Sequence, residues 1–190
     1  MGTGMAEWLV RFVGLALGSA LVVTALGVLV LRLAGRRPRP AAIVLALLTL
    51  FFLGLTQFPL PDPATMTCPQ PDTDPRLVPF NFARRLVGIL ATPDRAVAEL
   101  IAFGPAAALM NLLLCIAIGA ALARAAGSGG LALAALFGAT LTLTVEFTQL
   151  TGFWGLYPCP WRQFDLDDLV LNLAGVMLGF WAMRRIGRPS

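Results

Sequence analysis

An uncharged stretch of twenty residues, 12–31, restricts the fold of this chain more than any other feature of its sequence. At a rise of about 1.5 Å per residue, an α-helix of this length crosses a hydrocarbon core of about 30 Å. With 58% hydrophobic and 13% charged residues, the chain of 190 residues is too apolar for one soluble domain. The sequence therefore predicts an all-α integral membrane bundle of about five transmembrane helices, over 12–31, 41–58, 100–123, 131–150 and 169–183.

The predicted spans divide the chain into three parts. Residues 1–58 hold two N-terminal transmembrane helices, and residues 99–186 hold a three-helix core. Between them, residues 59–98 are rich in proline and contain both acids and arginines, which is typical of a loop outside the bilayer. Within this loop, 77–90 mixes apolar residues with Arg84 and Arg85, a pattern that favours an interfacial helix lying on the membrane surface.

The arginines predict an orientation. Eight of them lie in the loop between the first two spans, in the turn between the third and fourth, and in the C-terminal tail, and these segments contain no acid. Segments rich in arginine remain on the cytoplasmic side. We therefore expect the N-terminus outside, the C-terminus inside and the acidic residues at the outer face.

Two residue types are absent, and their absence excludes several kinds of site. The chain has no histidine, which removes zinc-hydrolase helices and serine–histidine or cysteine–histidine nucleophile pairs. It also has no lysine and no glycine-rich phosphate loop, and its arginines form no basic face with interleaved aromatic residues. We therefore expect no cofactor, no metal and no nucleic-acid partner.

The three cysteines occupy different regions. In the predicted orientation, Cys68 and Cys159 lie in the two outer loops, whereas Cys115 lies within the third span. A disulfide between Cys68 and Cys159 is feasible on an oxidising side of the membrane. Two independent cysteines are the alternative, because the sequence does not give the separation of their Cα atoms.

Polar residues recur at helical spacing in the last two spans. Thr142, Glu146 and Gln149 share one face of the fourth span, and that face should contact protein instead of lipid. Asn111 in the third span is expected to form the floor of the same pocket. On the fifth span a second face carries two polar residues and a GxxxG pair suited to close helix packing: Asp168, Asn172, Gly175 and Gly179.

An ionised Glu146 inside a membrane costs several kcal/mol unless it is paired, and Arg162 is the expected partner. The purpose of such a cluster stays open at this point. It could fix the outer loop onto the bundle, bind a polar ligand or headgroup, or perform acid–base chemistry.

Three motifs follow one another in the last part of the chain. They are Glu146-Phe-Thr-Gln149, then Arg162-Gln-Phe-Asp165-Leu-Asp167-Asp168, then Asn172-Leu-Ala-Gly175 followed by Gly179. In this order they resemble the VanZ-like family. The similarity spans about 79–183. One departure is that Asn111 is followed by Cys115 and Gly119, where the family usually continues to Phe-x-Pro-x-Gly.

The resemblance implies a multi-pass protein of the bacterial plasma membrane, whose namesake is associated with reduced susceptibility to the glycopeptide teicoplanin. We expect a non-enzymatic envelope protein whose partners are membrane lipids, with a cell-wall precursor or glycopeptide as a further candidate. The alternatives are a membrane enzyme with Glu146 as general base, and a small transporter or assembly subunit that forms a homo-oligomer through the Gly175 face. The expected headgroup pocket consists of Asn111, Glu146, Gln149, Arg162, Asp165, Asp168 and Asn172.

Overall fold

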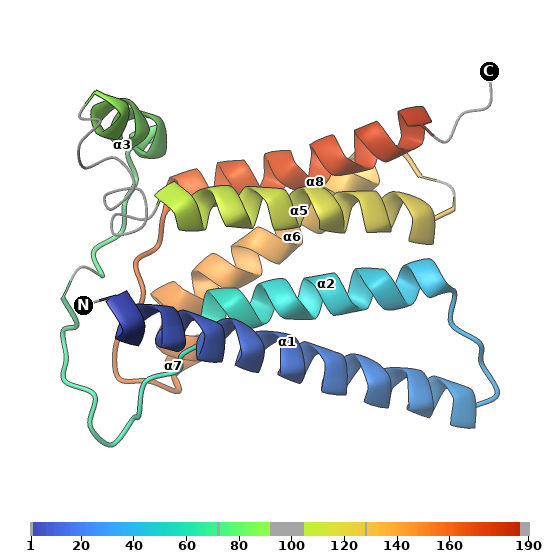
Figure 1. Cartoon of the computed structure of the whole chain (residues 1–190), viewed down its shortest axis with the longest axis horizontal. Helices are drawn as coiled ribbons and strands as arrows, with labels where there is room; N and C mark the ends of the chain where they lie inside the picture. The colour runs from blue at the N-terminus through green and yellow to red at the C-terminus, as the bar shows by residue number, and fades with distance from the viewer. Residues whose placement is uncertain (1, 72, 92–104, 128, 187–190) are drawn as a thin grey trace.

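A computed structural model of the chain describes residues 2–71, 73–91, 105–127 and 129–186 (Figure 1). The described residues form seven helices and no strand, which confirms the predicted all-α fold. Five of the helices are long and apolar enough to cross a membrane. The helices are α1 (Gly2–Leu33), α2 (Pro40–Gln57), α3 (Asn81–Leu90), α5 (Pro105–Ala125), α6 (Leu131–Leu150), α7 (Gly152–Gly155) and α8 (Leu166–Ile186).

The five long helices run along one another, and the start of α1 and the end of α8 lie at opposite ends of the bundle (Figure 1). Helix α8 packs most extensively against α5 and also against α6, while α2 joins α5 to α1. The buried core lies where these helices meet and includes Phe52, Ile118, Val176 and Phe180. Since α5 and α8 are parallel and α6 is antiparallel to both, the amino-terminal end of α8 lies beside the carboxyl-terminal end of α6.

Glycines allow α5 and α8 to pack with their backbones in contact. A Cβ built on Gly119 would overlap the carbonyl oxygen of Val176, and one built on Gly179 would overlap that of Ile116. At Gly175, an added Cβ would lie 2.8 Å from the carbonyl oxygen of Leu112. The Gly175 and Gly179 face is therefore covered by α5 of the same chain, which is how small-residue pairs bring membrane helices together.

The outward faces of the long helices are apolar. Val10 is 71% exposed, Leu33 is 80% exposed and Leu136 is 68% exposed. A soluble monomer rarely exposes apolar surface on this scale, whereas in a bilayer such side chains contact lipid. The exposed faces therefore agree with a multi-pass membrane protein.

The helix bounds differ from the predicted ones mainly at the ends. Helix α1 already begins at Gly2, and α8 begins at Leu166, three residues before the predicted span. The predicted third span began at residue 100, and its first part lies outside the described residues. Asn111 therefore lies in the second turn of the described helix α5. Helix α3 forms within the predicted interfacial segment and stands at one end of the bundle (Figure 1).

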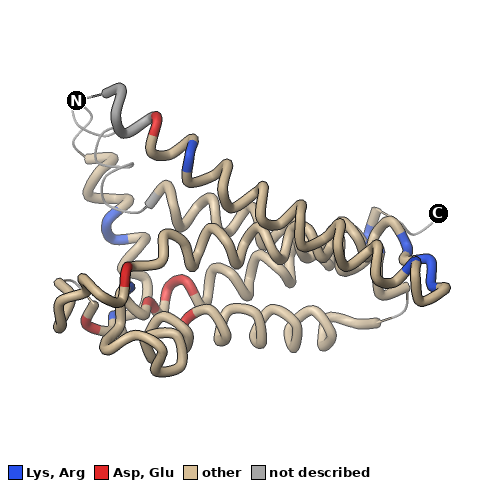
Figure 2. The backbone as a smooth tube through the Cα atoms, turned by 90° about the horizontal axis from the view of Figure 1, so that it is seen from below, with Lys and Arg blue, Asp and Glu red and all other residues tan. Residues whose placement is uncertain are grey.

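Charge is unequally distributed between the two ends of the bundle. The described acids lie at the end that carries the N-terminus, together with some arginines, and we call this the acid-rich end (Figure 2). At the opposite end, which we call the arginine-rich end, only arginines are found among the described charged residues (Figure 2). They are Arg32, Arg36, Arg37, Arg39, Arg124, Arg184 and Arg185.

Candidate functional site

The antiparallel packing of α6 and α8 brings the two predicted polar faces together at the acid-rich end. Asn172 Nδ2 donates to Thr142 Oγ1 at 3.5 Å, and the side chains of Leu173 and Val176 surround Gly138 one turn deeper. Asp168 lies one turn before Asn172 and interacts electrostatically with Glu146. Asn172 thus lies opposite Thr142, one turn deeper in the bundle than Glu146.

Glu146 connects the end of α6 to the segment that precedes α8. Its side chain is only 2% exposed, and its Oε2 accepts a hydrogen bond of 2.9 Å from the backbone N–H of Asp165. The expected pairing with Arg162 is not the contact that the structure contains. Arg162 instead donates from NH2 to the carbonyl oxygen of Phe58, at 2.6 Å.

Two side chains of the predicted cluster hold the carboxyl end of α2. The last carbonyl groups of a helix have no partner within it, and Pro59 follows closely here. Gln149 Nε2 donates to the carbonyl oxygen of Thr56 at 2.8 Å, and Arg162 binds that of Phe58. Both side chains therefore complete a helix terminus, and the guanidinium also meets the negative end of the helix dipole.

Asp165 begins α8 and binds the proline-rich loop. Its Oδ1 accepts from the backbone N–H of Asp167 at 2.9 Å, the geometry of a helix N-cap. Its Oδ2 lies 3.6 Å from Arg76 NH1. The backbone of the loop also pairs with the backbone before α8. The N–H of Arg76 donates to the carbonyl oxygen of Phe164 at 2.8 Å, and the N–H of Leu166 donates to the carbonyl oxygen of Arg76 at 3.0 Å. This short parallel bridge fixes the loop against the start of α8.

Asp167 anchors the beginning of α3. Its carboxylate is buried and accepts from the backbone N–H groups of Phe80 and Phe82, each at 2.6 Å. Phe80 has a positive φ of 61° and precedes the first residue of α3. The two donors belong to the first turn of a helix, which lacks internal acceptors. Asp167 therefore performs the capping that α3 cannot obtain from its own sequence.

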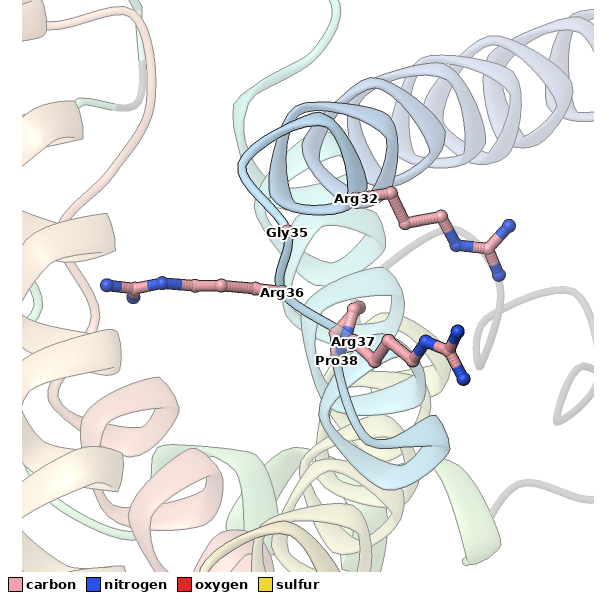
Figure 3. Close-up of a pocket in the computed structure, with 5 residues that line it drawn as sticks. All are labelled: Arg32, Gly35, Arg36, Arg37 and Pro38. Carbon is pink, nitrogen blue, oxygen red and sulfur yellow. The ribbon is translucent and has the colours of Figure 1, made fainter.

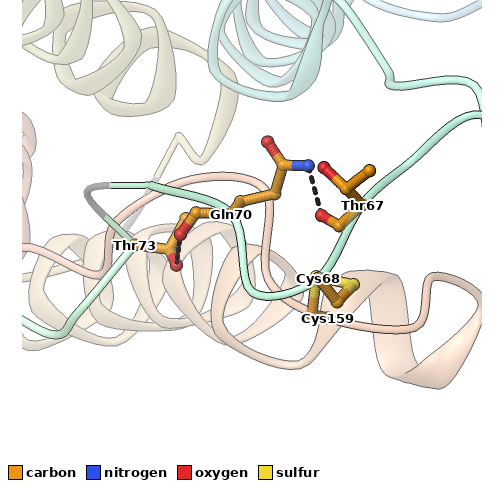
Figure 4. Close-up of a disulfide and its surroundings, with 5 residues drawn as sticks. All are labelled: Thr67, Cys68, Gln70, Thr73 and Cys159. Atoms are coloured by element: carbon orange, nitrogen blue, oxygen red, sulfur yellow. Dashed lines mark hydrogen bonds between the residues drawn. A yellow bond between two sulfur atoms is a disulfide. The ribbon is translucent and has the colours of Figure 1, made fainter.

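A disulfide provides a further link between the loop and the segment before α8. The sulfur atoms of Cys68 and Cys159 are bonded, and the Cα atoms lie 6.0 Å apart (Figure 4). Close by, Gln70 and Thr73 form local turns through hydrogen bonds to Thr67 and Gln70 respectively (Figure 4). Cys115, in contrast, is free and buried in α5.

Two acceptor groups of the predicted cluster are not used by the protein itself. In the part of the chain that the structure describes, no hydrogen bond reaches the Asp168 carboxylate, which senses Arg162 and Arg76 only through longer-range electrostatics. The Oδ1 atom of Asn172 is buried and also lacks a hydrogen-bond partner among the described residues. Leaving the buried Asn172 Oδ1 without a partner costs free energy, and the partly buried Asp168 carboxylate one turn away is an acceptor that is still available. Both groups are therefore candidates for contact with a ligand.

Arg162 supplies donors to the same region. Burial lowers the pKa of its guanidinium from the ordinary value, whereas the nearby Asp168 raises it. Only one donor, NH2, is engaged by a described acceptor, the carbonyl oxygen of Phe58. A guanidinium has five N–H donors, so Arg162 can bind a phosphate or a hydroxyl while it holds the end of α2.

The remaining predicted residue, Asn111, lies on α5 at the acid-rich side of the contact between α5 and Gly175. Its side chain is half-buried, and no hydrogen bond from it to the predicted cluster is found within the described residues. Helix α5 continues unbroken past it to Ala125, so Gly119 serves close packing here without a kink.

Two contributors to this region lie outside the predicted pocket: Arg76 and Asp167. Arg76 and Asp167 meet partners about ninety residues away along the chain, and no local pattern indicates such a pairing. Among the described residues, no group of three acids or cysteines is arranged to hold a metal ion.

These features define a multi-pass helical membrane protein whose last two helices and proline-rich loop are joined by a buried polar network. A family model described as VanZ/LLP1 matches residues 44–187, and the chain therefore belongs to the VanZ-like family. The match begins within α2 and includes the proline-rich loop, so it extends beyond the motifs in 79–183. No curated protein matches the chain, and no solved structure matches it either.

Proposed function

We propose that this VanZ-like protein is a non-enzymatic component of a bacterial cell envelope that binds a lipid or glycolipid headgroup at its acid-rich end. The observation that carries the proposal is the group of unused polar atoms on Asp168, Asn172 and Arg162. Asn172 Oδ1 is buried without a partner among the described residues, and Asp168 faces Arg162 without a hydrogen bond there. Intramembrane polar groups of this kind usually serve function.

The chemistry of these atoms indicates the class of headgroup. The carboxylate of Asp168 and Oδ1 of Asn172 are acceptors, so they suit hydroxyl, amide or amine groups of a ligand. The guanidinium of Arg162 is a donor and suits a phosphate. A phosphate that carries a sugar or an amide satisfies both sets, whereas a bare phosphate would be repelled by the neighbouring acids.

The other carboxyl groups have a different task. Glu146, Asp165 and Asp167 already accept backbone hydrogen bonds that fasten the loop and the start of α8. The proposed site therefore rests on a structural network that positions Asp168 and Asn172. Because Glu146 Oε2 is engaged in this network, we favour binding over acid–base catalysis.

The proposal includes an orientation in the plasma membrane with the acid-rich end outside and the C-terminus inside. It is supported by the arginines at the opposite end, since these favour the cytoplasmic side. It is also supported by the disulfide at the acid-rich end, because disulfides persist in oxidising compartments.

Thiol labelling of intact cells tests this orientation. We expect an impermeant maleimide to label the wild-type protein only after an impermeant reductant has opened the Cys68–Cys159 bond. Cys115 should stay unlabelled because it is buried in α5. The control is Gly130→Cys at the arginine-rich end, where nothing lies within 4 Å of an added Cβ. Labelling of that cysteine from outside, with Cys68 and Cys159 protected, would contradict the proposed orientation.

Headgroup binding is tested by Asp168→Asn, a change that removes the acceptor charge and keeps the shape of the side chain. Loss of a charged hydrogen bond of about 1.5–3 kcal/mol should weaken retention of the co-purified headgroup lipid by roughly tenfold to a hundredfold. Native mass spectrometry of the purified protein measures this retention. The melting temperature should stay unchanged, since no described residue donates a hydrogen bond to this carboxylate.

The matched control is Asp74→Asn, which removes one exposed carboxylate from the same end of the molecule. The two variants are also compared by teicoplanin susceptibility in a deletion strain complemented at equal membrane expression. We expect wild type and Asp74→Asn to restore tolerance, and Asp168→Asn to fail. Equal lipid retention and equal tolerance in both variants would overturn the proposal.

A further inference from the structure

A hollow at the arginine-rich end lies far from the site described above. It has a volume of about 600 Å³ and is lined by the turn between α1 and α2, namely Arg32, Gly35, Arg36, Arg37 and Pro38. Figure 3 shows Arg32 and Arg37 extending to one side of this turn and Arg36 to the other. The volume lies within the range of about 300–1,000 Å³ that is usual for small-molecule sites.

These arginines are not needed to complete the end of α1. Gly35 adopts a positive φ of 74°, and its N–H donates to the carbonyl oxygen of Arg32. The N–H of Arg36 donates to the carbonyl oxygen of Leu31, so the backbone itself satisfies the last carbonyl groups in a Schellman motif. The guanidinium groups of the hollow are therefore not needed to cap the carboxyl end of α1.

No acid among the described residues neutralises the hollow either. Within the described residues, Arg32, Arg36 and Arg37 have neither an ion pair nor a side-chain hydrogen bond, and the described acids lie at the other end (Figure 2). These three arginines are exposed, and guanidinium groups clustered without counter-charges repel one another, so the hollow favours an anion from outside the chain.

The neighbouring helix ends show the same lack of acceptors. Arg184 NH1 donates to the carbonyl oxygen of Gly127 at 2.7 Å, and Arg39 NH1 would lie 3.6 Å from a Cβ built on Gly127. The Nε and NH2 atoms of Arg184 are buried and have no hydrogen-bond partner among the described residues. Two guanidinium groups thus lie close to Gly127, and that of Arg184 has donors left over.

We propose that the arginine hollow binds the phosphodiester headgroup of an anionic phospholipid, with Arg32 and Arg37 as the principal ligands. Arg32 lies in the last turn of α1, where the apolar span Glu7–Leu33 ends and the headgroup layer of a bilayer begins. The acyl chains of the lipid lie along the exposed apolar face of α1. This binding is independent of the headgroup site at the acid-rich end.

The test uses the full chain purified in mild detergent, in an Asp168→Asn background so that lipid at the acid-rich end does not contribute. Phosphatidylglycerol and zwitterionic phosphatidylethanolamine are titrated, and bound lipid is counted by native mass spectrometry. We expect a preference for phosphatidylglycerol that weakens at least tenfold in the double variant Arg32→Gln/Arg37→Gln. The control Arg124→Gln removes an exposed charge from the same end and should bind like the parent.

Three results would overturn the proposal. They are equal binding of the two lipids by the parent protein, unchanged phosphatidylglycerol binding by the folded double variant, and an equal loss in Arg124→Gln, which would indicate diffuse charge. A competition arm with glycerol phosphate and inorganic phosphate identifies the source of the anion. Displacement of the lipid by either soluble compound at equal concentration would show that the hollow is a site for soluble phosphate and not for a lipid.

Discussion

Replacing Gly179 with alanine is expected to drive α5 and α8 apart and to remove most of the folded protein from a mild-detergent extract. The added Cβ would overlap the carbonyl oxygen of Ile116, which belongs to helix backbone and cannot rotate away. Overpacking usually costs 1–3 kcal/mol, and a clash with backbone belongs at or above the upper end, about 3 kcal/mol. Because α5 and α8 share the most extensive contact of the bundle, the loss affects the whole core.

The matched control for Gly179→Ala is Gly27→Ala in α1. Nothing lies within 4 Å of a Cβ built on Gly27, so this substitution makes the same chemical change in a helix without a clash. Size-exclusion profiles and thermal unfolding in detergent compare the two variants. A well-folded Gly179→Ala protein with the melting temperature of the wild type would show that the two backbones are not in contact.

Replacing Asp167 with alanine is expected to release the beginning of α3 from the bundle. The substitution removes two charge-assisted hydrogen bonds of 2.6 Å and leaves the N–H groups of Phe80 and Phe82 without acceptors. At about 1.5–3 kcal/mol for each such bond, the local cost is roughly 3–6 kcal/mol. Hydrogen exchange and protease sensitivity should therefore rise over Asn81–Leu90, whereas the part of the loop that is held by the disulfide and by Arg76 should keep its contacts.

Asp167→Asn provides a graded comparison, because a carboxamide keeps one acceptor oxygen and loses the other. Its effect should lie between those of wild type and Asp167→Ala. Asp168→Asn removes a charge from the adjacent position, where no described donor is bound, and should leave exchange over α3 unchanged. If Asp167→Ala and Asp168→Asn gave the same exchange pattern, the anchoring role of Asp167 would be wrong.

Much of the fold could be predicted from the sequence because bilayer thickness imposes a length on each span. The apolar run 131–150 matches Leu131–Leu150 of α6, and 41–58 agrees with Pro40–Gln57 of α2 to within one residue. Helical spacing also placed Glu146 and Gln149 on a buried face, and both side chains are buried in the structure. These predictions depend only on local periodicity, which the sequence carries directly.

The contacts of the site could not be predicted in the same way, because they join distant segments. Periodicity indicates that Glu146 faces protein, but it cannot show that its acceptor is used by the backbone of Asp165 instead of by Arg162. In the same way, the partner of Arg162 is a main-chain carbonyl at the end of α2, and main-chain groups carry no sequence signature. The role of Asp167 depends on the conformation of Phe80, which no neighbouring residue indicates.

The anchoring of the proline-rich loop has a consequence for the order in which the chain matures. The loop leaves the ribosome well before its three partners, Cys159, Asp165 and Asp167, which lie after α6 and at the start of α8. The loop must therefore stay unfastened until the segment from Cys159 to Asp167 has been synthesised and has packed against it. Closure of the Cys68–Cys159 bond during biogenesis would then mark the point at which these two distant segments have met.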